Sequence, residues 1–392
     1  MGAEILLYGY GIVCLSMLVF NVLYGLHLRS DGQRMDTKVG IIRRRMTEQL
    51  ELLQENPSGP AQTFQTVQAS HLAWMRRHLS RINYLLAFDG LLDELDDHSE
   101  VYQIYLKQMQ PVFLYLATVY WKRESTQAAY FCYFLSRHKF RRHMELDQIQ
   151  QVMLSYLKKD SLYCKINAWK ALCSFGSPSV IVKALQELGT GDTSQLHEKV
   201  ITEALLTYTG DPKDLIEVLW SQMERFSIPI QRAVLDYIRF QSGNYRKQML
   251  EILRDKHRDK ELRLSAIRYF GRYTDPAARP LLLGFLQDSD PTHWEYSAIS
   301  ASSLAGYDGQ DVVDALLRAM NSSNWYIRSN AASSLEAHGL SYEQMFQVLS
   351  GGDRYAREML AYRLKSKRLQ EEADLAATEA ASTQREGEPV GV

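Results

Sequence analysis

One pattern constrains this chain more than any other feature: from Lys165 onward, a polar residue recurs every 31 to 34 positions with a similar sequence after it. Two helices of about a dozen residues, joined by two turns, would fill such a period. The sequence therefore predicts an array of helical repeats. We call the recurring polar residues anchors; they are Lys165, Lys199, Gln231, Arg263, Ser297 and Arg328.

The residues that follow each anchor predict how the helices pack. The third position is small or moderately sized, and the seventh position is large and apolar. A short side chain allows two helix axes to approach, and a large one fills the core beside it. The third positions are Ala168, Thr202, Val234, Ala266, Ser300 and Ala331, and the seventh positions are Leu172, Leu206, Ile238, Phe270, Leu304 and Leu335.

The turn inside each repeat has its own signature, in which glycine or threonine is followed by Asp or Ser and often by Pro. Asp and Ser cap helix N-termini, and Pro is favoured at the first helical position. We therefore expect a second helix to begin after each of these turns, at 176–178, 210–212, 274–276 and 306–309.

These motifs resemble a known family, the HEAT repeats in their bacterial form, related to the PBS-lyase type. Leu262-Arg263, Ala266, Asp275-Pro276 and Leu286-Gln287-Asp288 match one unit, and Ile327-Arg328, Ala331-Ala332 and Leu335 match another. The resemblance covers about residues 160–339, although Gln231 and Ser297 replace the usual basic anchor. It implies a right-handed superhelix whose second helices line a concave face that binds proteins or other ligands, and it implies no single function.

Outside this region the chain also reads as helical, so the predicted fold class is all-α, an α-solenoid of HEAT-type helix pairs preceded by a single transmembrane helix. Helices are expected at 64–80, 82–96, 100–122, 126–137 and 145–158; whether 63–158 consists of true repeats is left open. The expected organisation is an external N-terminus at 1–4, a transmembrane anchor at 5–28, a juxtamembrane amphipathic helix at 29–55, a linker at 56–62, divergent helical repeats at 63–158, HEAT repeats at 159–341, capping helices at 342–369 and a disordered acidic tail at 370–392.

The membrane anchor is predicted from the uncharged apolar run at 5–28. At 1.5 Å per residue, about 24 residues reach roughly 36 Å, enough for the hydrocarbon core of a bilayer. The charge before the run is small, and the basic residues follow it, which favours an uncleaved anchor with the C-terminal body inside the cell. These membrane-flanking residues are Arg29, Arg34, Lys38, Arg43, Arg44 and Arg45. The predicted location is the inner (plasma) membrane, single-pass, with the N-terminus outside and the solenoid in the cytoplasm.

The segment after the anchor has apolar residues at steps of three and four, from Met35 to Leu53, as in an amphipathic helix. Three roles stay open for its apolar face: a short coiled coil, contact with anionic lipid, or packing against the solenoid.

Two groups of residues are candidates for partner binding. Trp294 and Trp325 each lie three positions before an anchor, where they form either an aromatic platform or ordinary packing between repeats. The second group is a basic run that fits anionic headgroups, a phosphate-bearing ligand, an acidic partner, or a solvated loop. Its candidate residues are Arg137, Lys139, Arg141 and Arg142.

Other chemistry finds little support in the sequence. No P-loop, nucleophile elbow, zinc-protease motif or dinucleotide fingerprint is present, so we expect no catalytic residue, no cofactor and no enzymatic activity. The four cysteines have no metal-site spacing and are expected to be buried thiols. Lys and Arg total 45 against 46 for Asp and Glu, which argues against nucleic acid as a partner.

The sequence thus predicts a membrane-tethered scaffold or adaptor that binds a protein. A membrane protein, such as an envelope or polysaccharide biosynthesis enzyme, is one candidate for this partner. Two alternatives are kept: a signalling component that relays through the juxtamembrane helix, and a HEAT-like lyase or base-excision enzyme. Homo-oligomerisation is left open.

Overall fold

The computed structural model describes residues 2–54, 66–94, 99–138, 140, 147–190, 196–339, 346, 348–363 and single positions up to 374. Every secondary-structure element within these ranges is a helix, which confirms the all-α prediction. The chain divides into two compact units, Met1–Gln222 and Met223–Val392, and each is described by itself. The predicted linker at 56–62 lies outside the described residues, as does most of the predicted tail.

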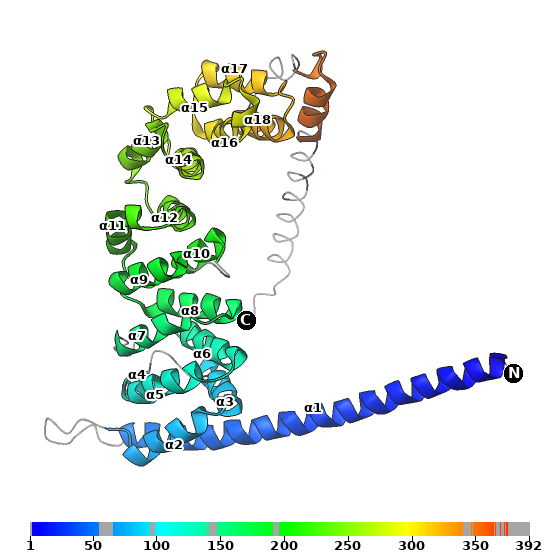
Figure 1. Cartoon of the computed structure of the whole chain (residues 1–392), viewed down its shortest axis with the longest axis vertical. Coiled ribbons are helices and arrows are strands. Elements are labelled where there is room, and N and C mark those ends of the chain that lie inside the picture. The colour runs from blue at the N-terminus through cyan, green and yellow to red at the C-terminus, as the bar shows by residue number, and fades with distance from the viewer. Residues whose placement is uncertain are drawn as a thin grey trace, which may run out of the picture. The chain divides into compact units, whose positions relative to one another are not determined.

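Unit 1 contains the first helices of the chain (Figure 1). Their bounds are α1 Gly2–Gln54, α2 Ala69–Leu79, α3 Ile82–Asp93, α4 Glu100–Gln108, α5 Gln110–Trp121, α6 Ser125–Arg137, α7 Asp147–Tyr156, α8 Leu162–Phe175, α9 Pro178–Gly189, α10 Glu198–Leu205 and α11 Pro212–Ser221. The helix expected at 100–122 is divided in two at Met109, because Pro111 has no backbone N–H and is favoured in a first helical turn.

Helices of unit 1 stack in two layers. In one layer α6, α8 and α10 pack in sequence order, and in the other α5, α7, α9 and α11 do the same. Phe88 of α3 contacts Phe134 of α6, so the first layer also extends toward the N-terminus. The described helices of the region 63–158 therefore share the two-layer arrangement of the helices that follow them.

The long helix α1 covers both the predicted anchor and the predicted juxtamembrane helix without a break. Its C-terminal part packs against α3 and α4, where Ile42, Met46 and Leu53 are buried. Of the three roles left open for this apolar face, the structure thus shows packing against the solenoid. Among the side chains that the structure describes, no helix combines the length and the apolarity of a membrane span. The side chains at 5–9, 11, 12, 14, 22, 23 and 25–28 lie outside the described set.

In the part of unit 2 that the structure describes, four first helices and three second helices are followed by helical residues at 354–363. The first helices are α12 Ile228–Gln241, α14 Lys260–Arg272, α16 Trp294–Ser303 and α18 Trp325–Ala337; the second helices are α13 Arg246–Arg254, α15 Arg279–Leu286 and α17 Gln310–Ala319. Short 3₁₀ turns lie at Met223–Arg225, Pro291–His293 and Leu304–Gly306.

The anchors of unit 2 share one contact: each side chain donates a hydrogen bond to a backbone carbonyl just before its own helix. These carbonyls lie at or beyond the end of the preceding helical segment, where no intrahelical partner exists. The bonds are Gln231 to Phe226 (2.9 Å), Arg263 to Leu253 (3.4 Å), Ser297 to Phe285 (2.9 Å) and Arg328 to Ser322 (2.5 Å). Arg357, 29 residues after Arg328, makes the same bond to Gly351 (2.7 Å). The sequence pattern had missed this further anchor.

The predicted packing positions are buried with one exception. All six third-position residues are buried, and five of the seventh-position residues are fully buried. Leu206 is 37% exposed, so its predicted core role is wrong. The reason is that α10 is only eight residues long and ends at Leu205, one position too early to carry Leu206 into the core.

In unit 2 the first helices lie on the inner side of the bend. Figure 1 shows α14, α16 and α18 there, with α13, α15 and α17 on the outer side. The first helices also pack on one another more extensively than the second helices do. A Cβ at Gly271 would lie 2.8 Å from the Ser303 Oγ, so glycine permits the close approach of α14 and α16. The family resemblance implies second helices on the concave face, and in this unit that expectation is wrong. The small residues of the first helices let these helices approach closely, which places them on the inner side.

The anchor bonds predict a specific loss of stability. Replacing Gln231 with Leu leaves the buried carbonyl of Phe226 without its donor, which should lower the free energy of unfolding by about 1–3 kcal/mol. The control is Gln241→Leu, at an exposed position of the same helix, which should change it by less than about 0.5 kcal/mol. Chemical denaturation followed by circular dichroism measures both, and equal effects would contradict a role for the anchor.

Candidate functional site

Four aromatic residues lie at the N-terminal ends of successive first helices in unit 2. We call this set, Trp294, Trp325, Tyr326 and Tyr355, the aromatic edge. The rings of Trp294 and Tyr326 stack at 5.5 Å, and Trp325 meets Tyr326 edge-on at 5.2 Å. The Arg328 guanidinium lies 5.3 Å from the ring of Tyr355. Contacts thus run from one repeat to the next along the edge.

The aromatic edge is largely open to solvent. Trp325 is 55% exposed, Tyr326 56% and Tyr355 64%, whereas Trp294 is only partly exposed. Of the two interpretations of the tryptophan pair, packing between repeats fits Trp294, whereas an exposed aromatic platform fits Trp325. Exposed Trp and Tyr with a neighbouring Arg are the residue types that dominate protein-binding energetics.

Tyr326 and Tyr355 were missed from the sequence, although a signal for them exists. Each lies two positions before an anchor, Arg328 and Arg357 respectively, so the two tyrosines occupy equivalent places in consecutive units. Aligning the position two before each anchor would have shown them together. Tyr163, at the same position in α8 of unit 1, is also exposed, at 77%.

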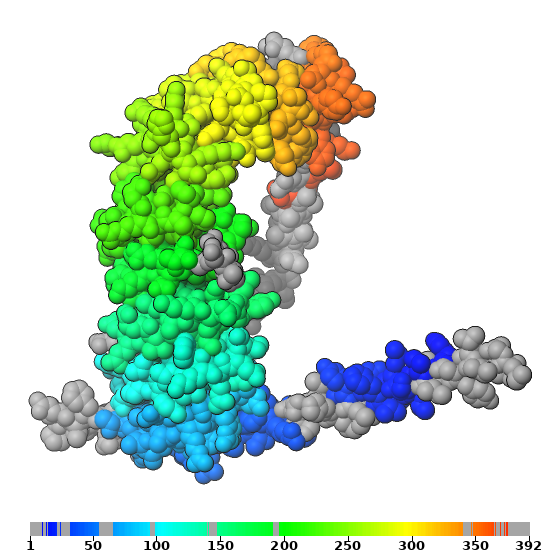
Figure 2. Space-filling view, in the orientation of Figure 1, coloured from blue at the N-terminus to red at the C-terminus, as the bar shows by residue number. Residues whose placement is uncertain are grey.

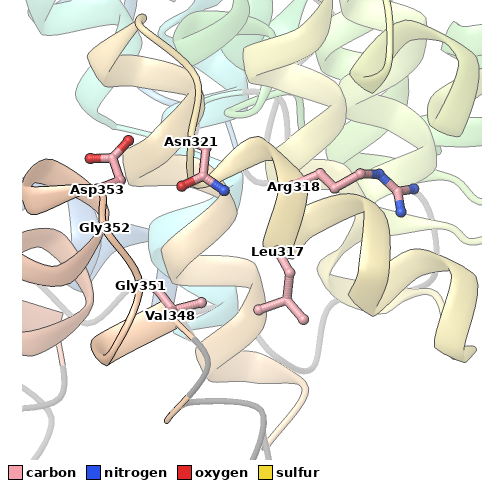
Figure 3. Close-up of a pocket in the computed structure, with 7 residues that line it drawn as sticks. All are labelled: Leu317, Arg318, Asn321, Val348, Gly351, Gly352 and Asp353. Carbon is pink, nitrogen blue, oxygen red and sulfur yellow. The ribbon is translucent and has the colours of Figure 1, made fainter.

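A pocket of about 360 Å³ lies between α17 and the start of the last helical segment (Figure 3). It is lined by Leu317, Arg318, Asn321, Val348, Gly351, Gly352 and Asp353. Its one carboxylate, Asp353, already accepts hydrogen bonds from the backbone N–H groups of Tyr355 and Ala356. Asp353 is therefore an N-cap, and the pocket offers few polar groups to orient a ligand.

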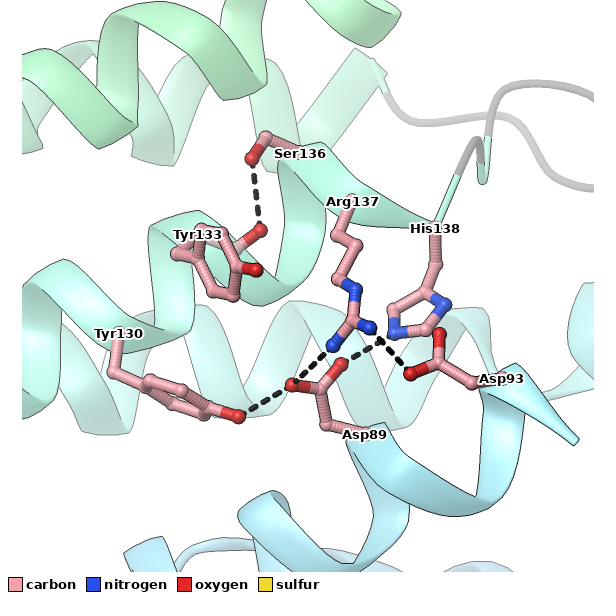
Figure 4. Close-up of polar contacts among 7 residues, drawn as sticks. All are labelled: Asp89, Asp93, Tyr130, Tyr133, Ser136, Arg137 and His138. Atoms are coloured by element: carbon pink, nitrogen blue, oxygen red, sulfur yellow. Dashed lines mark hydrogen bonds and ion pairs between the residues drawn. The ribbon is translucent and has the colours of Figure 1, made fainter.

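A polar cluster with a buried carboxylate at its centre joins α3 to α6 in unit 1 (Figure 4). Its centre is Asp89, whose side chain is 5% exposed. Asp89 accepts hydrogen bonds from Tyr130 and from the Arg137 guanidinium (3.4 Å), and its other oxygen lies 2.5 Å from the His138 Nε2. Arg137 also bonds Asp93 at 2.5 Å.

The electrostatics of this cluster favour an ionised Asp89. Burial would raise the pKa of this carboxyl, but the hydrogen bonds from His138 and Tyr130, together with the charge of Arg137, hold it below its ordinary value. Arg137, predicted as a partner-binding residue, is thus already bound to two carboxylates within the chain. The other members of that basic run, Lys139, Arg141 and Arg142, lie outside the described residues.

Several of the residues predicted to flank the membrane make contacts within unit 1. Arg43 pairs with Glu94, the residue after α3, and Arg44 lies 3.0 Å from Glu48. Lys38 lies 5.9 Å from the ring of Tyr84, and Arg45 lies 4.6 Å from the ring of Trp74. Arg34 is exposed, and the side chain of Arg29 is outside the described set.

His71 lies near Arg45 in unit 1. Burial and the positive charge of Arg45 lower the pKa of His71 to about 4, and the negative charge of Glu48 opposes this shift. His71 contacts the Tyr105 hydroxyl at 3.0 Å.

The described parts of the chain hold no group of three or more His, Cys, Asp or Glu side chains arranged for a metal ion. Cys132, Cys164 and Cys173 are buried free thiols, as expected, and the side chain of Cys14 is not described. Burial raises the pKa of Cys132 and of Cys173 well above the ordinary thiol value.

Comparison with known proteins assigns part of the chain. The family model described as HEAT repeats matches the sequence from α13 to α18. The match covers residues 246–336, less than a quarter of the chain. No curated protein matches the chain. Among solved structures, human deoxyhypusine hydroxylase in complex with glycerol is similar over 76% of this chain and 95% of its own, at 14% identity and a TM-score of 0.26. A likeness at that level carries no argument about activity.

The polar cluster generates a test of its structural role. Replacing Asp89 with Asn removes the charge from the hydrogen bonds with Arg137 and His138, so the free energy of unfolding at pH 7 should fall by about 1.5–3 kcal/mol. Asp93→Asn breaks only an exposed ion pair and should cost less than about 1 kcal/mol. Urea denaturation of the two variants compares them directly, and a larger effect at Asp93 would contradict this assignment.

Proposed function

We propose that the protein is a non-enzymatic scaffold, tethered to the membrane by the N-terminal part of α1, whose HEAT repeats bind a protein partner. The aromatic edge is the single observation that carries the binding part of the proposal. Its open rings occupy consecutive repeats at equivalent positions, so a partner that follows the array would meet them in order. HEAT repeats suit this use because stacked repeats present extended surfaces.

The tether rests on a different observation. The N-terminal part of α1 stands clear of the body of unit 1, as Figures 1 and 2 both show. Its described apolar side chains are exposed by 48% to 73%, and they include Tyr10, Val13, Leu15, Met17, Leu18, Val19, Phe20 and Tyr24. Soluble proteins rarely expose a continuous apolar surface of this kind, and a bilayer would bury it on every side.

The charges around this segment set the proposed orientation. Residues 5–28 contain no Asp, Glu, Lys or Arg, and the basic residues follow them. Because basic flanks are retained in the cytoplasm, we place the N-terminus outside and the repeats inside, at the inner (plasma) membrane. A partner that is itself a membrane protein would then meet the repeats at a raised local concentration.

The alternative of a relay by dimerisation of the juxtamembrane helix has less support. The apolar face that would form its coiled coil is buried on α3 and α4, at Ile42, Met46 and Leu53. These contacts also determine where a fragment without the N-terminal part of α1 should begin. A chain that begins after Gln54 would lose part of the unit 1 core, whereas one that begins near Arg34 would retain it.

Affinity capture tests the binding surface. The full chain, purified from its native membranes with its partners, should retain a specific protein, and Trp325→Ala with Tyr326→Ala should reduce that protein at least about tenfold. The matched control is Trp121→Ala with Tyr133→Ala, which removes two exposed aromatic rings from unit 1. Equal losses from both double variants, or no protein retained by the parent chain, would refute the proposal.

Membrane extraction tests the tether separately. The parent chain should stay in the membrane pellet after alkaline carbonate washing. Leu15→Glu with Leu18→Glu should release most of the protein, because each buried charge costs about 2.5–3.5 kcal/mol in a bilayer. Leu52→Glu, at an exposed position near the end of α1, is the control and should leave the protein in the pellet. Release of the parent chain itself would rule out an integral anchor.

A further inference from the structure

A second surface of unit 2 lies on α12 and α14, apart from the aromatic edge. On α14, Arg268 and Arg272 are one helical turn apart, and among the described residues neither has a carboxylate oxygen within 4.0 Å. Arg268 is half-buried, while Arg272 is exposed. A partly desolvated guanidinium without a carboxylate in direct contact is energetically unfavourable, so we expect a binding partner to supply that carboxylate.

The neighbouring helix adds to this positive charge. Arg239 of α12 lies 4.6 Å from the ring of Phe240, and Arg272 of α14 lies 5.6 Å from the same ring. Phe240 is 40% exposed. The ring therefore contacts guanidinium groups from two different repeats, in the arrangement of a cation–π interaction. We call these four residues, Arg239, Phe240, Arg268 and Arg272, the arginine face.

The carboxylates near the arginine face are too few to neutralise it. Asp236 lies 3.1 Å from the Arg239 Nη2, and Glu261 lies 3.1 Å from the Arg232 Nη2. The four arginines at positions 232, 239, 268 and 272 therefore outnumber these two carboxylates, and the group as a whole carries a net charge of +2. Burial lowers the pKa of Arg268. The positive charges of Arg239 and Arg232 lower this pKa further, and the negative charges of Asp236 and Glu261 raise it.

The spacing of the arginines suits an extended acidic chain. Four helical positions separate Arg268 from Arg272, or about 6 Å along the helix axis. Alternate side chains of an extended peptide are about 6.6 Å apart, so carboxylates at alternate positions would match both arginines. Arginine also binds carboxylate through two parallel hydrogen bonds, which a lysine cannot make.

We propose that the arginine face binds an extended acidic segment of the protein partner, with carboxylates on Arg268 and Arg272 and an apolar side chain against Phe240. This deepens the proposed scaffold function and rests on it for the class of ligand. A nucleic acid fits less well, because the chain as a whole has 45 basic against 46 acidic residues and the face is only two helices wide.

The binding test uses the full chain in detergent micelles and a fluorescein-labelled decapeptide of alternating glutamate and alanine. Fluorescence anisotropy should show saturable binding at low salt, which weakens as salt is raised. Arg268→Gln with Arg272→Gln should weaken binding about tenfold or more, because two charge-assisted hydrogen-bond pairs are lost. A glutamine–alanine peptide of the same length should bind neither protein.

The matched control is Arg254→Gln with Arg318→Gln. It removes the same charge from exposed positions on the second helices α13 and α17, and it should bind the acidic peptide as the parent chain does. Arg272→Gln alone changes an exposed side chain, so it keeps the test decisive if the double variant does not fold; about threefold weaker binding is expected from it.

Three results would overturn the proposal. The first is no binding of the acidic peptide by the parent chain. The second is equal weakening in the two double variants, which would make net charge the cause. The third is an oligonucleotide of equal charge that binds more tightly and depends on the same arginines, which would change the ligand class. Failure of affinity capture with intact peptide binding would instead count against the scaffold function alone.

Discussion

The structure of unit 2 depends on the hydrogen bond from each anchor to a carbonyl before its own helix. A helix leaves its last carbonyls without internal partners, and in a stacked array those carbonyls are covered by the next repeat. Gln231, Arg263, Ser297, Arg328 and Arg357 all supply the missing donor. Because the donor is required and the charge is not, glutamine and serine replace arginine without changing the arrangement.

Much of the repeat architecture was predictable because it is local in sequence. An anchor, a small residue three positions later and a large one seven positions later lie within two turns of one helix, so their spacing alone indicates their roles. The failures have equally local causes. Leu206 missed the core because α10 ends early, and Arg357 was overlooked because its repeat is shorter than the others. The inner position of the first helices depends on stacking, which the pattern within one helix does not specify.

The candidate surfaces show where sequence reasoning ended. Trp294 and Trp325 were found by their register, but only the fold distinguishes a packed ring from an open one. Arg137 was predicted to be available for a partner because Asp89 and Asp93, which it binds, are more than forty positions away in the chain. The arginine face could not be predicted from the sequence for the same reason. Its residues come from two helices and form a surface only when α12 and α14 stack.

The continuity of α1 has a consequence for how this chain can change over time. Helix α1 runs without interruption from Gly2 to Gln54, and Ile42, Met46 and Leu53 near its C-terminal end belong to the core of unit 1. Each residue of a helix advances it by 1.5 Å and turns it by about 100°. Inserting or deleting one residue between the two parts would therefore rotate the N-terminal part by more than a quarter turn about the helix axis. Point substitutions in this stretch leave that angle unchanged, so its length is expected to be far less variable than its composition.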